Sequence, residues 1–174
     1  YILFFCISPG FSQITDYKFN HIDLNDGLSN LNVSCFAKDE LGFIWIGTED
    51  GLNRFDGKNI KVYRNREDKN NTISNNDIYA LLATKKYLYI GNEGYGIDRY
   101  NLEKDEFETF RIVNENGAVV PGKVNDIYEL KNKNILIGAD NGLYIFDTKN
   151  EKLRPYFNGE AKKIFAKITV LNIH

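Results

Sequence analysis

A segment of 14 or 15 residues occurs three times in the chain, and this internal repeat constrains the fold more than any other feature. The copies are residues 43–56 (FIWIGTEDGLNRFD), 87–101 (YLYIGNEGYGIDRYN) and 134–147 (NILIGADNGLYIFD). Their matching glycines, Gly47, Gly91 and Gly138, are 44 and 47 residues apart. A second pattern precedes each copy, as VSCF at 33–36, IYAL at 78–81 and IYEL at 127–130. Two patterns that recur in step indicate three copies of one structural unit.

Each unit contains four short runs of strand-forming residues separated by turn formers. In the first unit the runs are 33–38, 43–47, 52–56 and 60–63. The dipeptides at 50–51 (DG) and 141–142 (NG) favour tight hairpins, because glycine adopts a positive φ without steric cost. A repeat of about 45 residues with four antiparallel strands is typical of a β-propeller blade. The alternative is a two-sheet sandwich with coincidental similarity between its segments.

The sequence therefore predicts an all-β fold, a partial β-propeller of about three four-stranded antiparallel blades plus the first strand of a fourth. The blades are expected at 31–65, 76–113 and 124–157, with the fourth beginning at 164–174. The second run of each unit does not alternate in polarity, so it should be buried on both faces between stacked blades. The positions that define the repeat are Trp45, Gly47, Gly51, Gly91, Gly96, Gly138 and Gly142.

Three blades cannot close a ring, since propellers have about four to eight blades. The expected partners are therefore the remaining blades of the same or a longer chain. An open arc would expose a strand edge and an apolar blade face. The alternative is a short protein that closes the ring by oligomerisation.

The chain begins with seven apolar residues, followed by small and polar residues at 8–13. This pattern predicts that 1–13 is the C-terminal part of a secretory signal peptide, with cleavage near Gln13 and the propeller domain at 14–174. The alternative is a buried N-terminal strand. No other stretch approaches the ~20 apolar residues of a membrane helix. After cleavage, Cys35 would be a lone, buried thiol.

Composition and residue types give little support to catalysis or to nucleic-acid binding. The 22 Lys and Arg residues are scattered and nearly balance 24 Asp and Glu residues, unlike the basic patch of a nucleic-acid-binding protein. The two histidines, His21 and His174, offer no base for a catalytic triad. No Cys/His spacing suits a metal, the segment 23–27 (DLNDG) lacks the closing Glu of a calcium loop, and no phosphate-binding glycine loop occurs. We expect no enzyme activity, metal or cofactor in this segment.

Residues 26–30 (DGLSN), 39–48 (DELGFIWIGT) and 51–56 (GLNRFD) closely resemble the two-component regulator propeller repeat. The second unit departs from the repeat with Asn92 in place of Thr and an inserted residue near Tyr95, and the third has Ala139 in place of Thr and lacks the Trp. The family is known from the periplasmic sensor regions of hybrid histidine kinases. By this resemblance, residues 17–24 would form an outer strand that completes the last blade of a ring.

The resemblance implies an exported, periplasmic part of a ligand-sensing propeller in a hybrid two-component sensor. The cue would be a carbohydrate, as an oligo- or monosaccharide, and the full-length protein would be a homodimer. A membrane helix and histidine kinase would lie in downstream segments. The alternatives are a protein-interaction propeller without a small ligand and a propeller enzyme that acts on polysaccharide.

Propeller topology places the turn between the second and third strands of each blade on the same rim as the linkers between blades. Loops on a rigid scaffold are common binding sites. Solvated turns and strand ends are the alternative interpretation of any one residue there. The weak ligand-binding candidates at or beside this rim are Asp50, Arg54, Glu93, Tyr95, Arg99 and Asp140.

Overall fold

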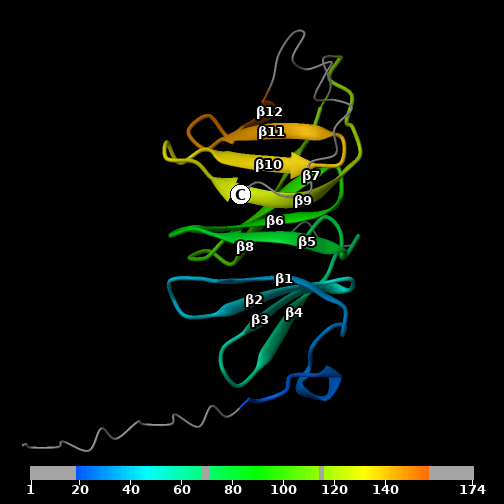
Figure 1. The fold of residues 1–174 in the computed structure, drawn as a ribbon, viewed down its shortest axis with the longest axis vertical. Coiled ribbons are helices and arrows are strands. Elements are labelled where there is room, and N and C mark those ends of the chain that lie inside the picture. Colours follow the sequence, from blue (N-terminus) through cyan, green and yellow to red (C-terminus); the bar gives the residue numbers. More distant parts are fainter. Residues whose placement is uncertain (1–18, 68–70, 114–115, 157–174) are drawn as a thin grey trace, which may run out of the picture.

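Three antiparallel sheets of four strands each follow one another along the chain in the computed structural model, which describes residues 19–67, 71–113 and 116–156. Blade 1 contains β1 (Val33–Lys38), β2 (Ile44–Thr48), β3 (Gly51–Phe55) and β4 (Ile60–Tyr63). Blade 2 contains β5 (Ile78–Ala83), β6 (Tyr87–Gly94), β7 (Gly96–Asn101) and β8 (Glu106–Arg111). Blade 3 contains β9 (Gly122–Glu129), β10 (Ile135–Ala139), β11 (Gly142–Asp147) and β12 (Lys152–Pro155). The blades stack along the long axis of the molecule, which confirms the predicted all-β propeller arc (Figure 1).

The described residues before blade 1 form a short 3₁₀ turn, η1 (Leu24–Asp26), rather than a strand. Asp23 caps this turn, and Gly27 ends it with a φ of 99°. The predicted outer strand at 17–24 therefore does not form over its described part, because its C-terminal end enters this turn. The predicted signal peptide at 1–13 and the predicted start of a fourth blade at 164–174 lie outside the described residues.

Blades 2 and 3 are joined at one rim by a short seam of backbone pairing. There the end of β6 pairs with the start of β9, through Glu93 with Lys123 and Gly94 with Gly122. The seam links the two blades into one continuous sheet at this point, whereas blade 1 remains a separate sheet.

The hydrophobic cores lie between the blades. One core packs Trp45 and Leu52 of blade 1 against Leu88, Ile90 and other apolar residues of blade 2. A second core packs blade 2 against blade 3 and includes Tyr89, Ile137 and Phe146. Successive residues of β6 thus face opposite neighbours, which explains why this strand does not alternate in polarity.

The repeated glycine of the second strand makes room for the first strand of the next blade. A Cβ on Gly47 would lie 2.7 Å from Cγ2 of Ile78, and a Cβ on Gly91 would lie 2.5 Å from Cγ1 of Val124. Ile78 and Val124 occupy matching positions at the starts of β5 and β9, so the predicted match of IYEL at 127–130 with IYAL at 78–81 is three residues out of register. Close approach between blades is therefore why the repeat has glycine here.

Replacing Gly91 with alanine is expected to destabilise the chain by about 2 kcal/mol, because the methyl group would overlap Val124 at the interface between blades 2 and 3. Urea denaturation followed by circular dichroism measures the change. Adding Val124→Ala should recover part of the loss, so the two effects should not be additive. Additive losses would contradict steric contact as the cause.

Candidate functional site

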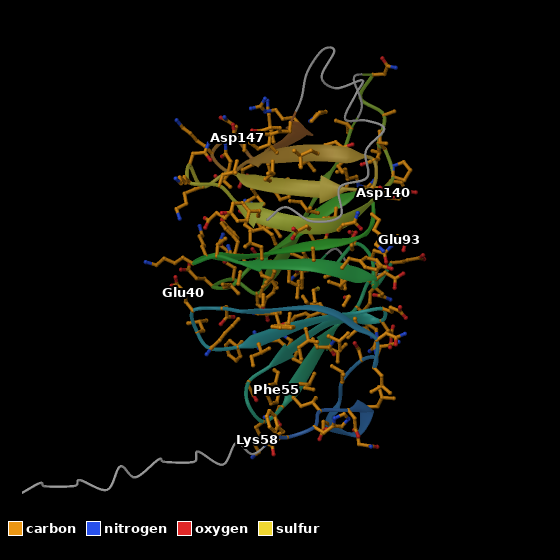
Figure 2. All side chains as sticks on the ribbon, viewed as in Figure 1. Glu40, Phe55, Lys58, Glu93, Asp140 and Asp147 are labelled. Atoms are coloured by element: carbon orange, nitrogen blue, oxygen red, sulfur yellow. The ribbon has the colours of Figure 1, made fainter. Side chains whose placement is uncertain are left out.

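The turns and linkers that the sequence analysis predicts at one end of the propeller lie on the rim where β6 pairs with β9. The β2–β3 turn contacts the following linker, where Gly51 N donates to Asn76 O at 2.9 Å. The β10–β11 turn contacts the start of β9, where Asp140 N donates to Lys123 O at 3.0 Å. Figure 2 shows Glu93 and Asp140 on this edge of the molecule, with Glu40 and Asp147 on the opposite edge.

A pocket of about 400 Å³ opens beside the seam, and three of the predicted residues line it. Glu93 and Tyr95 come from the β6–β7 hairpin, and Asp140 comes from the β10–β11 turn. Tyr95 is 53% exposed, so its ring is available to a ligand. We call this pocket the rim site; its full lining is Asn75, Glu93, Gly94, Tyr95, Pro121, Gly122, Lys123 and Asp140.

Hydrogen bonds and a cation–π contact hold the walls of the rim site in place. The Tyr79 hydroxyl donates to Oε2 of Glu93 at 3.3 Å, and Nζ of Lys123 lies 3.5 Å from the centre of the Tyr79 ring. The backbone N–H of Lys123 donates to Oδ1 of Asp140 at 3.0 Å. The amide of Asn75 donates to the backbone oxygen of Glu93. These contacts fix two carboxylates and one ammonium group around the opening.

The surroundings of the rim site are electrically negative. Burial, followed by the charge of Glu93, raises the pKa of Asp77 above its ordinary value. Burial and the charge of Asp77 raise the pKa of the Tyr79 hydroxyl. Such surroundings disfavour anionic ligands and suit neutral or cationic ones with hydrogen-bond donors.

Asp50 lies on the same rim but outside the pocket. Its carboxylate forms an ion pair with Arg64 at the end of blade 1, with Nη2 of Arg64 2.9 Å from Oδ2. Both side chains are nearly half exposed, so the pair ties the β2–β3 turn to the linker without burying either charge.

The prediction that Arg54 and Arg99 lie beside this rim is wrong. Each is three residues along the third strand from the glycine at the turn, which is about 10 Å of extended chain. Arg54 stacks over Phe43, with its guanidinium carbon 4.6 Å from the ring centre. Arg99 lines a pocket on the opposite rim.

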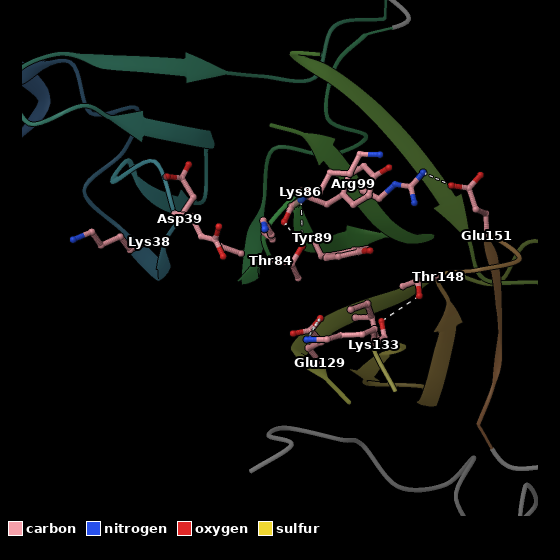
Figure 3. A pocket seen from close by; sticks show the side chains of 15 residues that line it. Lys38, Asp39, Thr84, Lys86, Tyr89, Arg99, Glu129, Lys133, Thr148 and Glu151 are labelled. Atoms are coloured by element: carbon pink, nitrogen blue, oxygen red, sulfur yellow. Dashed lines mark hydrogen bonds and ion pairs between the residues drawn. The ribbon is translucent and has the colours of Figure 1, made fainter. Parts of the chain in front are cut away.

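That second pocket, which we call the opposite groove, has a volume of about 570 Å³ (Figure 3). It contains Lys38, Lys86, Arg99, Glu129 and Glu151 among its charged residues. Burial opposes the charge of Arg99, but hydrogen bonds to Glu151 and Glu108 outweigh it and raise the pKa of the guanidinium. Because these carboxylates hold Arg99, the arginine is a structural residue here rather than a free anion-binding group.

A buried polar cluster ties the linker before each of the first two blades to that blade's third strand. In blade 2, Asp98 accepts hydrogen bonds from the backbone N–H of Ser74 at 2.8 Å, the Ser74 hydroxyl at 3.0 Å, the Asn92 amide at 2.9 Å and the Thr109 hydroxyl at 2.7 Å. In blade 1, Asn53 and Ser29 make the matching contacts. Sequence reasoning missed this cluster, although Ser29 and Ser74 are 45 residues apart, in step with the repeat.

Cys35, the cysteine within the described part of the chain, is half-buried on β1 rather than fully buried. Burial raises the pKa of its thiol to about 11.

No group of three or more His, Cys, Asp and Glu side chains within 19–67, 71–113 and 116–156 could hold a metal ion. The same part of the chain contains no helix long and apolar enough to cross a membrane.

Comparison with known proteins gives a consistent set of similarities. The family model of the two component regulator propeller matches residues 27–50. Histidine kinase P4 from Formosa agariphila is 40% identical over 63 residues, which are 36% of this chain and 5% of that protein.

Solved structures share the fold at lower identity. The extracellular domain assigned to hybrid two component system BT3049 from B. thetaiotaomicron matches 80% of this chain with a TM-score of 0.72 and 23% identity. The corresponding domain of system BT4673 matches 85% with a TM-score of 0.65 and 19% identity. The chain spans 20% and 19% of those two structures. It therefore has the architecture of about one fifth of each of these larger domains.

Proposed function

Because the chain contains a two component regulator propeller repeat within a β-propeller arc, we propose that it is part of the extracytoplasmic sensor region of a hybrid two-component regulator. The observation that carries this proposal is the match to the repeat at residues 27–50, in the first blade. The shared fold with extracellular domains assigned to hybrid two component systems supports it. In this proposal, export delivers the chain to the periplasm, and further blades, a membrane helix, a kinase and a second copy belong to the whole protein.

The proposed sensing function uses the rim site to bind a small carbohydrate. Tyr95 offers an exposed aromatic face, and Glu93 and Asp140 offer carboxylate acceptors for hydroxyl donors. The negative surroundings favour a neutral saccharide over a sulfated or uronic one. Arg54 and Arg99 are left out of this proposed site because they lie away from it. The chain's proposed role is binding, with no catalytic step.

Substitutions at the rim test this proposal in the whole sensor protein. A panel of neutral oligosaccharides is screened by thermal shift, and the best binder is measured by calorimetry against variants. Tyr95→Ala and Glu93→Gln should each weaken binding by about tenfold, because they remove a stacking surface and a charged acceptor. Glu40→Gln is the matched control, since this exposed carboxylate lies on the opposite edge (Figure 2). Unchanged affinity in both rim variants would place the ligand elsewhere.

A further inference from the structure

Two buried side-chain oxygens beside the rim site have no hydrogen-bond donor. Within residues 19–67, 71–113 and 116–156, the buried side-chain nitrogen and oxygen atoms without a partner are Oδ1 of Asn92 and Oδ1 of Asn141. Each lies against a glycine that lines the rim site, Asn92 against Gly94 and Asn141 against Gly122. Buried polar atoms are nearly always paired, so two unpaired acceptors beside one pocket indicate donors that come from outside the chain.

The amide of Asn92 is fully buried, and its orientation is fixed. Its nitrogen donates to Oγ of Ser74 at 3.0 Å and to Oδ2 of Asp98 at 2.9 Å, so turning the amide over would bring its oxygen against the Asp98 carboxylate. A Cβ on Gly94 would lie 2.7 Å from Oδ1 of Asn92. Apart from Asn92 and the chain neighbours of Gly94, the next residue to approach this Cβ position is Asn75, with its own Cβ 3.9 Å away. The missing side chain of Gly94 thus leaves room for a ligand atom beside Oδ1.

Asn141 holds the matching place on blade 3. Its nitrogen donates to the backbone oxygen of Pro121 at 2.7 Å, which fixes this amide as well. A Cβ on Gly122 would lie 2.8 Å from Oδ1 of Asn141. Gly94 and Gly122 are directly opposite each other in the seam, so their Cβ positions lie on one face, about 5 Å apart. The two acceptors therefore flank the seam on the same face, one from each blade, and one saccharide can reach both.

The unpaired oxygen of Asn92 is a departure from the repeat. Asn92 occupies the position of Thr48 in blade 1 and of Ala139 in blade 3, since each follows the repeated glycine of the second strand. The Thr48 hydroxyl lies 2.8 Å from Oγ of Ser29 and 3.0 Å from the backbone oxygen of Gly51, so it is paired within the chain. Ala139 has no polar side chain. The blade fold therefore does not require an unpaired acceptor at this position, and blade 2 has one beside the pocket.

Ligand atoms that satisfy these oxygens must be donors. An amide oxygen only accepts hydrogen bonds, and the carboxylates of Glu93 and Asp140 in the rim-site lining are acceptors too. The lining also contains the ammonium group of Lys123, which repels a cationic donor. Neutral hydroxyl groups are therefore the donors that fit.

We propose that Asn92 and Asn141 determine the specificity of the rim site, each accepting a hydrogen bond from a different hydroxyl of one neutral saccharide. The saccharide bridges blades 2 and 3 across the pair of Gly94 and Gly122. This inference rests on the proposed function, because it assigns the ligand groups that the rim site recognises. A saccharide that lacks either hydroxyl leaves an acceptor buried and unpaired, so the site discriminates against it.

Monodeoxy saccharides combined with amide variants test the proposal in the whole sensor protein. The probes are the best-binding neutral oligosaccharide of the panel and its analogues that each lack one hydroxyl, and calorimetry measures each dissociation constant. In the parent, one analogue should lose at least about tenfold in affinity, because it leaves Oδ1 of Asn92 unpaired. Asn92→Thr removes this acceptor and introduces the residue that blade 1 has. It should bind that analogue and the complete saccharide within about twofold of each other.

Asn141→Ala should remove the loss of affinity for a second analogue in the same way, and it tests the proposal even if Asn92→Thr fails to fold. Asn132→Ala is the matched control, because this exposed residue lies in the β9–β10 turn, whose Lys133 lines the opposite groove. The control should leave every loss of affinity unchanged.

Losses of affinity that persist unchanged in either variant would overturn the inference, because water rather than the saccharide would then pair with the oxygen. The proposed function survives that outcome if Tyr95→Ala still weakens binding. Coupling of both variants to the same hydroxyl would overturn the assignment of one hydroxyl to each amide. Absence of binding by every oligosaccharide of the panel would overturn both the inference and the proposed carbohydrate sensing.

Discussion

Replacing Asp98 with alanine is expected to destabilise the chain by about 3 kcal/mol, because four hydrogen-bond donors would lose their shared acceptor. Asp98 is fully buried, and the amide of Asn92 that it accepts from is also buried. The loss is measured as a lower free energy of unfolding in urea denaturation. A change below about 1 kcal/mol would show that water replaces the carboxylate.

Asp98→Asn is the matched control, since blade 1 uses Asn53 at the same position with the matching serine contacts. We expect this variant to lose much less stability than the alanine variant. Burial raises the pKa of Asp98 above its ordinary value of 3.8, despite the hydrogen bonds that it accepts. The protonated carboxyl of Asp98 therefore stabilises the folded chain fully below pH 3.8. This stabilisation is lost as the pH rises through the pKa of Asp98 in the folded state. Relative to Asp98→Asn, the parent should lose stability with rising pH; a relative gain would show that the donors outweigh burial.

Replacing Trp45 with alanine is expected to cost about 3–5 kcal/mol, since the ring fills the core between blades 1 and 2. The indole is fully buried, with its centre 5.1 Å from that of the Tyr100 ring and 5.8 Å from that of Tyr63. Its Nε1 donates to Oδ2 of Asp39 at 2.8 Å. Circular dichroism in urea measures the loss, because the variant lacks the chain's single tryptophan fluorophore.

Trp45→Phe separates ring packing from the hydrogen bond. It keeps an aromatic ring in the core but leaves one oxygen of the buried Asp39 without the indole donor, so we expect a smaller loss of about 1–2 kcal/mol. Equal losses in both variants would mean that the contact with Asp39, rather than the volume of the ring, makes the main contribution.

The sequence was sufficient to predict the blades because each blade is encoded by local signals. Strand runs, turn dipeptides and the spacing of Gly47, Gly91 and Gly138 all recur within about 45 residues. The glycines of the repeat are required for different reasons. Gly51 and Gly142 have positive φ, at 122° and 138°, as their hairpin dipeptides predict. Gly96 is instead required by close packing, because a Cβ there would lie 1.9 Å from the backbone oxygen of Phe110.

The candidate site was only partly predictable. The position of a strand residue relative to the rim depends on the strand register, and the sequence pattern does not determine that register. Tyr95 and Asp140 belong to turns and Glu93 lies one residue before the end of β6, and these positions reach the rim whatever the exact register. Arg54 and Arg99 lie within strands, and a few residues of extended chain carry them towards the other rim. The ion pair of Glu151 with Arg99 joins residues 52 positions apart, so no local sequence pattern predicts it.

The location of the cores between blades has a consequence for how the chain folds. A single blade has little interior of its own, so the smallest cooperative unit is a pair of neighbours, and stability should grow as a nearest-neighbour sum along the array. Among residues 19–156 that the structure describes, blade 2 takes part in both interfaces, whereas blades 1 and 3 each take part in one. Backbone amides of β6 and β7 should therefore exchange with solvent more slowly than those of β2 or β11, and opening should begin at the ends of the array and move inward.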